Sequence, residues 1–118
     1  MSPPLLCYLR RERRKWAFTQ EELAFLLGKT STPHISRLEQ GKSPPSAAIL
    51  IACEVLFDTT SRTIFPKRYT EIEELVLARA AELYALLESE KTPAAHKKKE
   101  FLHTLLNRAI THLNQEGT

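Results

Sequence analysis

The feature that most constrains the fold of this chain is a series of closely spaced helix start signals between residues 19 and 57. The first is a capping box, in which the Thr19 hydroxyl accepts from the Glu22 amide and the Glu22 carboxylate reaches back to the Thr19 amide. Gly28 follows, and glycine readily takes the positive φ of a helix C-terminus. The sequence therefore predicts a short helix over residues 20–27.

A second start signal follows almost at once. Thr32 is suited to be an N-cap, and Pro33 then occupies the first helical position, where proline is favoured. Gly41 ends this segment, which predicts a helix over residues 32–40. Two short helices joined by a tight turn containing glycine are typical of a helix-turn-helix motif.

A third start signal stands at Pro45 and Ser46. The helix that it predicts, Ala47–Phe57, is apolar on nearly every side, so we expect it to be the central buried helix. Residues 60–65 predict one more short helical turn.

The rest of the chain is also helical in pattern. Ser2 before Pro3 predicts a helix that runs through Lys15. No segment alternates with a period of two over the length of a strand, and the chain has 3 glycines. The predicted fold class is therefore all-α.

Two long helices are expected after a linker at residues 67–70. The first covers residues 71–89, and Thr92 with Pro93 starts the second. The apolar stripe of the first comprises Ile72, Leu75, Val76, Leu83, Leu86 and Leu87. That of the second comprises Phe101, Leu102, Leu105, Leu106, Ala109, Ile110 and Leu113. Because the loop between them is short, they should form an antiparallel hairpin whose seam is made by these stripes.

Charge is unevenly distributed along the chain. Residues 1–66 contain nine Lys and Arg against six Asp and Glu, whereas residues 67–118 contain eight of each. A nucleic-acid footprint is therefore expected in the first half. No apolar run approaches the ~20 residues that cross a bilayer, so no membrane partner is expected. The N-terminus lacks the order of a secretion signal, which predicts a cytoplasmic protein.

Four segments together resemble the Cro/repressor-type (XRE) helix-turn-helix family: TQEELAFLLG, HISRLEQGK, PPSAAILIACEVLF and SRTIFP, within residues 5–66. The resemblance implies a lambda-repressor-like five-helix DNA-binding domain at residues 1–66. Residues 67–118 then form a helical extension outside the common motif. It also implies a bacterial transcription regulator, more often a repressor, that binds double-stranded DNA by sequence and associates with the nucleoid. Ala17 stands where glycine is common in the family.

A recognition helix presents its first turns to base edges while its inner face packs on the preceding helix. Ile35 and Leu38 can supply that inner face, with Ala24 small enough for close approach. Arg37 is the expected base reader, because a guanidinium pairs bidentately with guanine. The resemblance implies that Gln20 binds phosphate or supports a base contact. The predicted DNA-binding residues are Gln20, Thr32, Pro33, His34, Ser36, Arg37 and Lys42.

Further charged residues have more than one interpretation. Lys42 is expected to meet backbone phosphate, and the resemblance implies a buried salt bridge between Glu39 and Arg13. The basic run at residues 10–15 could grip phosphate or be a solvated helix end that complements the dipole. Residues 97–99 are better explained as a solvated face than as a second DNA site.

Catalytic and metal-binding chemistry is not indicated. Cys7 and Cys53 have no metal-ligand spacing and fit two buried small hydrophobes better than a redox pair. His96, His103 and His112 are never four residues apart, which argues against a metal site on the last helix. No nucleophile elbow or phosphate loop is present. The sequence therefore predicts neither an enzyme nor a cofactor.

The predicted hairpin needs a partner, since a pair of helices has little core of its own. We prefer a homodimer through this hairpin, with two recognition helices about 34 Å apart on an inverted repeat. Packing of the hairpin on the first domain remains open. So do an antitoxin-like protein-interaction module that uses the hairpin, and a structural protein that coats the nucleoid without sequence preference.

Overall fold

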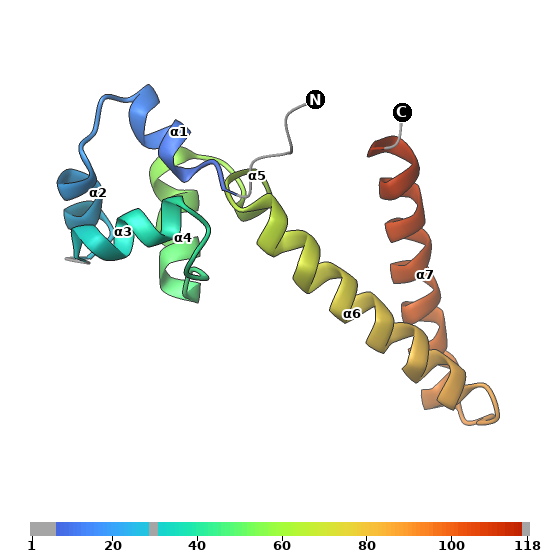
Figure 1. Ribbon diagram of the computed structural model, residues 1–118. Coiled ribbons are helices and arrows are strands. Elements are labelled where there is room, and N and C mark those ends of the chain that lie inside the picture. The colour runs from blue at the N-terminus through green and yellow to red at the C-terminus, as the bar shows by residue number, and fades with distance from the viewer. Residues whose placement is uncertain (1–6, 29–30, 117–118) are drawn as a thin grey trace. The chain divides into compact units, whose positions relative to one another are not determined.

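A computed structural model describes residues 7–28 and 31–116, with side chains to residue 111. These residues form seven helices and, within those ranges, no strand, which confirms the predicted all-α class (Figure 1). The chain divides into two compact units, residues 1–71 and residues 72–118, called here the N-terminal and C-terminal units.

The N-terminal unit contains the five helices expected of the DNA-binding domain. They are α1 (Leu9–Lys15), α2 (Gln20–Leu26), α3 (Thr32–Glu39), α4 (Ala47–Phe57) and α5 (Ser61–Ile64). Helix α3 packs against α1 and α2, and α4 packs against α5. Their shared core comprises Cys7, Leu9, Leu23, Ala24, Ile35, Leu38, Ile49, Cys53, Ile64 and Phe65.

Hydroxyl caps set the helix starts. The capping box of α2 is confirmed: Thr19 Oγ1 accepts from the Glu22 amide at 3.0 Å, and Glu22 Oε1 accepts from the Thr19 amide at 2.9 Å. The cap of α4 is also confirmed, since Ser46 Oγ accepts from the Ile49 amide at 3.2 Å. Each such cap satisfies an amide that the helix cannot pair by itself.

The N-cap of α3 is Ser31 rather than the predicted Thr32. Ser31 Oγ accepts from the His34 amide at 3.4 Å, so Pro33 occupies the second helical position. Serine caps as well as threonine, and starting here adds a bond from the Ile35 amide to the Ser31 carbonyl. Proline has no amide hydrogen, but Pro33 removes no helical hydrogen bond at this position, because amides of the first turn have no partner within a helix.

Helix α1 begins at Leu9, so the prediction that it starts near residues 2–3 is wrong in position. The predicted cap itself lies outside the described residues. Tyr8 is not helical, and its amide donates to the Ile64 carbonyl at 2.7 Å. This bond joins the start of α1 to the end of α5, which local sequence signals could not foresee.

The C-termini of α1 and α3 share one geometry. Beyond α1, Ala17 takes a φ of 62°, and the Phe18 amide donates to the Arg13 carbonyl at 3.1 Å. Beyond α3, Gly41 takes a φ of 74° and the equivalent bonds form. This is the Schellman arrangement, in which a left-handed residue ends the helix. Glycine fits it without cost, whereas the Cβ of Ala17 crowds the neighbouring carbonyl.

We therefore expect Ala17→Gly to raise the free energy of unfolding by about 1 kcal/mol, because it removes that crowding. Gly41→Ala should lower it by a similar amount. Urea denaturation followed by circular dichroism, at one protein concentration, measures both. A loss of stability in Ala17→Gly would contradict this account of the turn.

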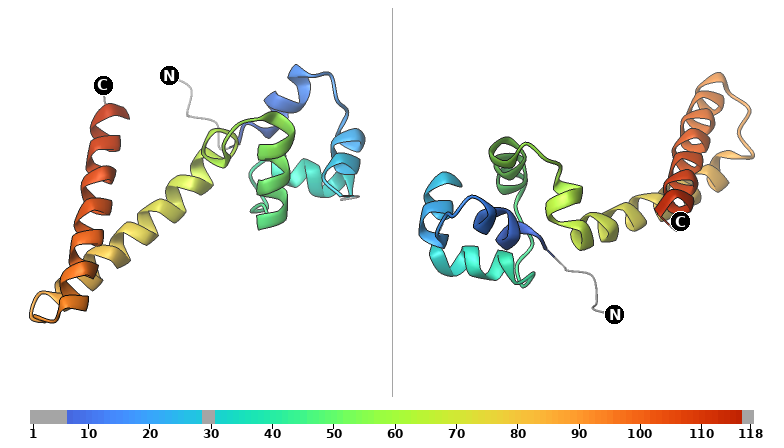
Figure 2. Two further views of the ribbon diagram at one scale, coloured as in Figure 1. Left: turned by 180° about the vertical axis from the view of Figure 1, so that it is seen from behind. Right: turned by 90° about the horizontal axis from the view of Figure 1, so that it is seen from above.

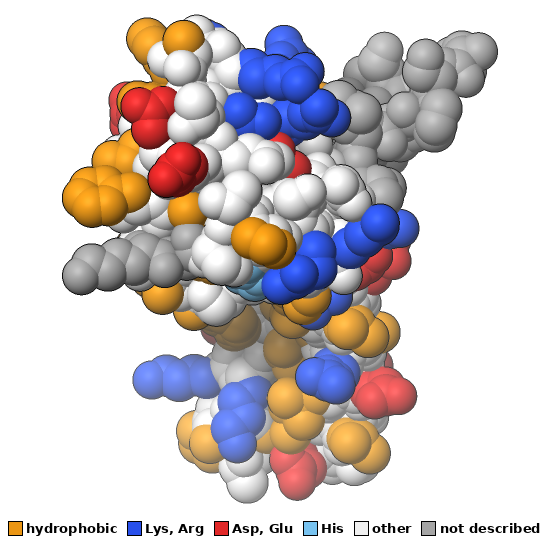
Figure 3. Space-filling model, turned by 60° about the vertical axis from the view of Figure 1, so that its left-hand side comes forward, with side chains coloured by type: hydrophobic (Ala, Val, Ile, Leu, Met, Phe, Trp, Pro, Cys, Tyr) orange, Lys and Arg blue, Asp and Glu red, His pale blue; other side chains and the backbone are white. Residues whose placement is uncertain are grey.

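Helix α4 has the predicted bounds, but the prediction that it is the central buried helix is wrong, because much of its surface is exposed. Ile49 and Cys53 face the core, and burial raises the pKa of the Cys53 thiol to about 12. Ile51 and Val55 are 62% and 75% exposed. A unit this small has too few elements to cover all sides of one helix. Large hydrophobic side chains consequently stand on the surface (Figure 3, orange).

The remaining helices are α6 (Pro66–Leu87) and α7 (Pro93–Glu116). The prediction of a linker at residues 67–70 is wrong, because this segment is the first turn of α6. Pro66 is well placed to start a helix, and the Tyr69 amide donates to the Phe65 carbonyl at 2.9 Å. No helix in the described ranges is both long and apolar enough to cross a bilayer.

Within the C-terminal unit, α6 and α7 form the predicted hairpin. Helix α7 starts at the predicted cap, where Thr92 Oγ1 accepts from the Ala95 amide at 3.1 Å. The buried seam consists of Ala80, Leu87, Ala95 and Leu102, with Tyr84, Leu105 and Leu106 packed against it. From the connecting loop the two helices diverge (Figures 1 and 2).

The seam of the hairpin is not the one predicted. Of the six apolar residues expected to form it on α6, all of them described, only Leu87 is buried. Helices approach closely where side chains are small, and Ala80 and Ala95 provide that contact. The bulkier residues are left on an adjoining face of α6, which the described part of the chain does not cover.

Candidate nucleic-acid interface

Helix α3 is anchored by one face. Ile35 and Leu38 are buried against the core as predicted, and Glu39 is buried beside them. Ala24 of α2 is 5% exposed, so a small side chain lies where α2 and α3 pack together. The opposite face of α3 is left to solvent.

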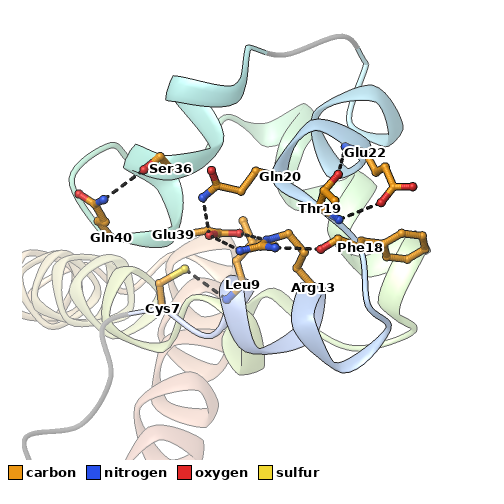
Figure 4. Close-up of polar contacts among 10 residues, drawn as sticks. All are labelled: Cys7, Leu9, Arg13, Phe18, Thr19, Gln20, Glu22, Ser36, Glu39 and Gln40. Carbon is orange, nitrogen blue, oxygen red and sulfur yellow. Dashed lines mark hydrogen bonds and ion pairs between the residues drawn. The ribbon is translucent and has the colours of Figure 1, made fainter.

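The outer face of α3 carries four polar or small residues. With about 100° between successive residues, Pro33, Ser36, Arg37 and Gln40 fall within one third of the helix circumference. Pro33, Arg37 and Gln40 are exposed and Ser36 is half-buried. Gln40 Nε2 donates to Ser36 Oγ at 3.1 Å, so these two side chains are coupled (Figure 4).

The remaining predicted residues of the recognition helix lie at its sides. Thr32 is exposed at the first helical position, on one flank of the outer face. His34 is half-buried and lies on the opposite flank, next to the turn that carries Leu38. The structure thus groups Pro33, Ser36 and Arg37, and it separates His34 from them. Gln40 was missed, although its spacing of four from Ser36 places both on one face.

A buried ion pair fixes α3 to α1. Arg13 Nε lies 2.6 Å from Glu39 Oε2, and Arg13 Nη2 donates to Glu39 Oε1 at 3.2 Å. Arg13 Nη1 also donates to the Phe18 carbonyl at 2.8 Å (Figure 4). Both residues are 8% exposed, which confirms the buried salt bridge that the family resemblance implied. A bidentate pair with an additional acceptor satisfies most of the guanidinium in a site that excludes water.

Gln20 belongs to the same network. Its Nε2 donates to Glu39 Oε1 at 3.0 Å, and the side chain is half-buried. An amide has two donor hydrogens, so one remains for another acceptor. The first residue of α2 is therefore held against the last residue of α3, at the edge of the outer face.

Lys42 is exposed in the loop that follows α3. It lines a hollow of about 230 Å³ together with Lys67 and Arg68 from the first turn of α6. Arg68 also pairs with Glu71 at 3.3 Å. The sequence did not point to Lys67 and Arg68, because their segment was expected to be a linker. Glu71 lines the same hollow, but the three basic side chains outnumber its single carboxylate, which suits an anion such as a phosphate.

The basic run at residues 10–15 does not act as a unit. Arg13 is buried in its ion pair with Glu39, whereas Lys15 lies over the Trp16 ring, 5.4 Å from its centroid. Arg11 lies similarly over Tyr8, at 5.7 Å. The exposed members can meet phosphate, but none is positioned by a bond to α3.

The arrangement can bind a polyanion and present polar side chains to it. The described residues contain no group of three His, Cys, Asp or Glu that could hold a metal ion. A protein-family model described as Helix-turn-helix matches residues 9–64 of the chain. No curated protein and no solved structure matches the chain.

Proposed function

Through residues 9–64 the chain belongs to the Cro/repressor-type helix-turn-helix family of DNA-binding transcription regulators, and on this premise we propose that it is a repressor that reads operator DNA in the major groove with α3. The observation that carries the proposal is the division of α3 into a buried face and an exposed polar one. A helix held so firmly can enter a groove without losing its packing.

Each residue has a defined part in this proposal. Arg37 and Ser36 face the base edges, with Thr32, Pro33 and His34 at the first turn. Lys42 and Gln20 contact backbone phosphates, which position the helix but carry no sequence information. Lys67 and Arg68 extend the phosphate contacts beside Lys42.

The two kinds of contact differ in their response to mutation. Arg37→Ala should weaken binding to the cognate duplex by about 1–3 kcal/mol and relax the preference at one base pair. Lys42→Ala should weaken binding to all duplexes alike and reduce the salt dependence by about one phosphate contact. Fluorescence anisotropy on cognate and scrambled duplexes over a salt series separates the two. Equal losses on both duplexes for Arg37→Ala would contradict a base contact.

Selection from a random duplex library at fixed salt, followed by sequencing, tests the proposal as a whole. Salt must be fixed because affinity from phosphate contacts depends steeply on it. An enriched inverted repeat is the expected result. Retention without enrichment would indicate binding to the backbone alone, and absence of retention would reject DNA binding.

We further propose that the protein acts as a homodimer, in the cytoplasm and on the nucleoid. The exposed apolar residues of α6 support dimerisation through the C-terminal unit. The same residues could instead bind a different protein, as an antitoxin-like module would. Sedimentation equilibrium of the purified chain distinguishes these, since only self-association gives a dimer without another component.

A further inference from the structure

A stripe of exposed apolar side chains runs along α6. Its members are Ile72, Leu75, Leu83 and Leu86, which are 47%, 57%, 45% and 73% exposed, and Arg79 lies in the middle. Val76, which is 49% exposed, lies beside these residues, toward the seam. Single exposed leucines are ordinary, but a row of them along one helix face marks an interaction site. We call this row the α6 stripe.

The α6 stripe is distinct from the seam that α6 shares with α7. At about 100° per residue, its members centre roughly 90° around the helix from Ala80, Tyr84 and Leu87, which form the seam. A helix in a four-helix bundle buries two such adjoining faces, one against each neighbour. From Ala80 to the loop, α7 covers one of these faces, and the second has no neighbour in the described chain.

The spacing of the α6 stripe is symmetric about Arg79. Leu75 and Leu83 lie four residues to either side of it, and Ile72 and Leu86 lie seven. In an antiparallel pair related by a two-fold axis, each residue meets its counterpart from the opposite side of the centre. Two copies of α6 centred on Arg79 would therefore match apolar positions along the whole stripe.

We propose that the α6 stripe is the dimer interface, where α6 pairs antiparallel with α6 of a second copy and the two hairpins form a four-helix bundle. Leu75 then packs on Leu83 of the second copy, and Ile72 packs on its Leu86. This inference rests on the homodimer proposed above, and it names the surface and register of that dimer. It does not rest on the proposed DNA sequence specificity.

Two observations favour a second copy in this orientation. The seam of the hairpin buries only four residues among those described, two of them alanines, and a core that small needs to be completed by another chain. An antiparallel pair also places the positive end of each helix dipole beside the negative end of its partner. At the axis the two Arg79 side chains would meet, and Glu82, three residues along each helix, would offset their repulsion.

Disulfide trapping tests the register in the full chain. Leu75→Cys and Leu83→Cys are co-expressed with tags of different length, and the purified protein is oxidised and run on a non-reducing gel. The heterodimer should link, and Arg79→Cys should link with itself at the axis. Leu75→Cys alone should give only the background of the wild type, whose Cys7 and Cys53 are buried. Ala85→Cys, an exposed position away from the α6 stripe, is the matched control.

A second variant tests the interface without cysteine chemistry. Leu75→Glu with Leu83→Glu should raise the Kd of the dimer at least ~100-fold, because four charges enter the interface. Val55→Glu, on the exposed face of α4, should leave the Kd unchanged. Circular dichroism confirms that each variant remains helical.

The outcomes separate the two proposals. A dimer in sedimentation that gives no link between Leu75→Cys and Leu83→Cys would overturn the α6 stripe but keep the homodimer. Equally strong linking of Leu75→Cys with itself would show a parallel pair and overturn the register. A monomer at micromolar concentration would overturn both.

Discussion

Replacing Glu39 with alanine should lower the free energy of unfolding by about 3–5 kcal/mol, because Arg13 would be left charged, buried and without its carboxylate. Domains of this size are commonly stable by only about 5–15 kcal/mol, so this variant should be partly unfolded under mild conditions. The Arg13 contact to the Phe18 carbonyl cannot compensate, since a carbonyl carries no net charge. Urea denaturation of wild type and variant measures the loss.

Two controls make this result specific. Glu71→Ala removes the partner of an exposed ion pair with Arg68 and should change stability by less than about 1 kcal/mol. Arg13→Met combined with Glu39→Leu removes both buried charges and should restore most of the stability that Glu39→Ala loses. If Glu39→Ala lowered the free energy of unfolding no more than Glu71→Ala does, the buried ion pair would not be holding α1 to α3.

The second large effect is expected from Ile35→Ala, which should lower the free energy of unfolding by about 2–5 kcal/mol. Ile35 is fully buried in the core, on the inner face of α3, so its truncation leaves a cavity where the recognition helix is anchored. The neighbouring side chains are close-packed and can fill that space only in part.

Ile51→Ala is the matched control for this prediction. It makes the same chemical change on α4, at a position that is 62% exposed. Its effect should stay within about 0.5 kcal/mol, as is usual for surface substitutions. Both variants are compared by urea denaturation at one protein concentration, because an oligomer would make stability depend on concentration. Similar losses in the two would mean that Ile51 is buried in the protein in solution.

Local signals predicted the helices well wherever the determining contacts are close in sequence. Thr19 and Ser46 bond to amides three residues away, so their types and spacing suffice to predict helix starts. The glycine after α3 likewise ends the helix by bonds within one turn. The family match at residues 9–64 agrees with the motif that these signals outlined.

Burial was predicted less well, because apolar character shows what a residue can bury and not what is present to cover it. Ile51 and Val55 are as apolar as Ile49, but only Ile49 has core residues beside it. The same reason explains why Leu83 was expected in a seam that Ala80 forms. The start of α1 depends on a bond between Tyr8 and Ile64, far apart in the sequence.

The candidate site shows the same division. The resemblance placed Arg37 on the recognition helix, and the exposed position of Arg37 agrees with the proposed base contact. Lys67 and Arg68 were not expected beside Lys42, since that proximity arises only when the first turn of α6 folds next to the loop after α3.

The hydrogen bond from Gln20 to Glu39 has a consequence for the thermodynamics of recognition. A free glutamine on a surface samples many rotamers and must lose that freedom when it contacts a ligand. Gln20 has already given up much of it, because Glu39 is immobilised by Arg13. In the proposed complex, the remaining N–H of Gln20 would therefore meet DNA with a smaller entropic penalty. The buried Arg13–Glu39 ion pair, which stabilises the fold, thus also orders the N–H donor of Gln20 before DNA binds.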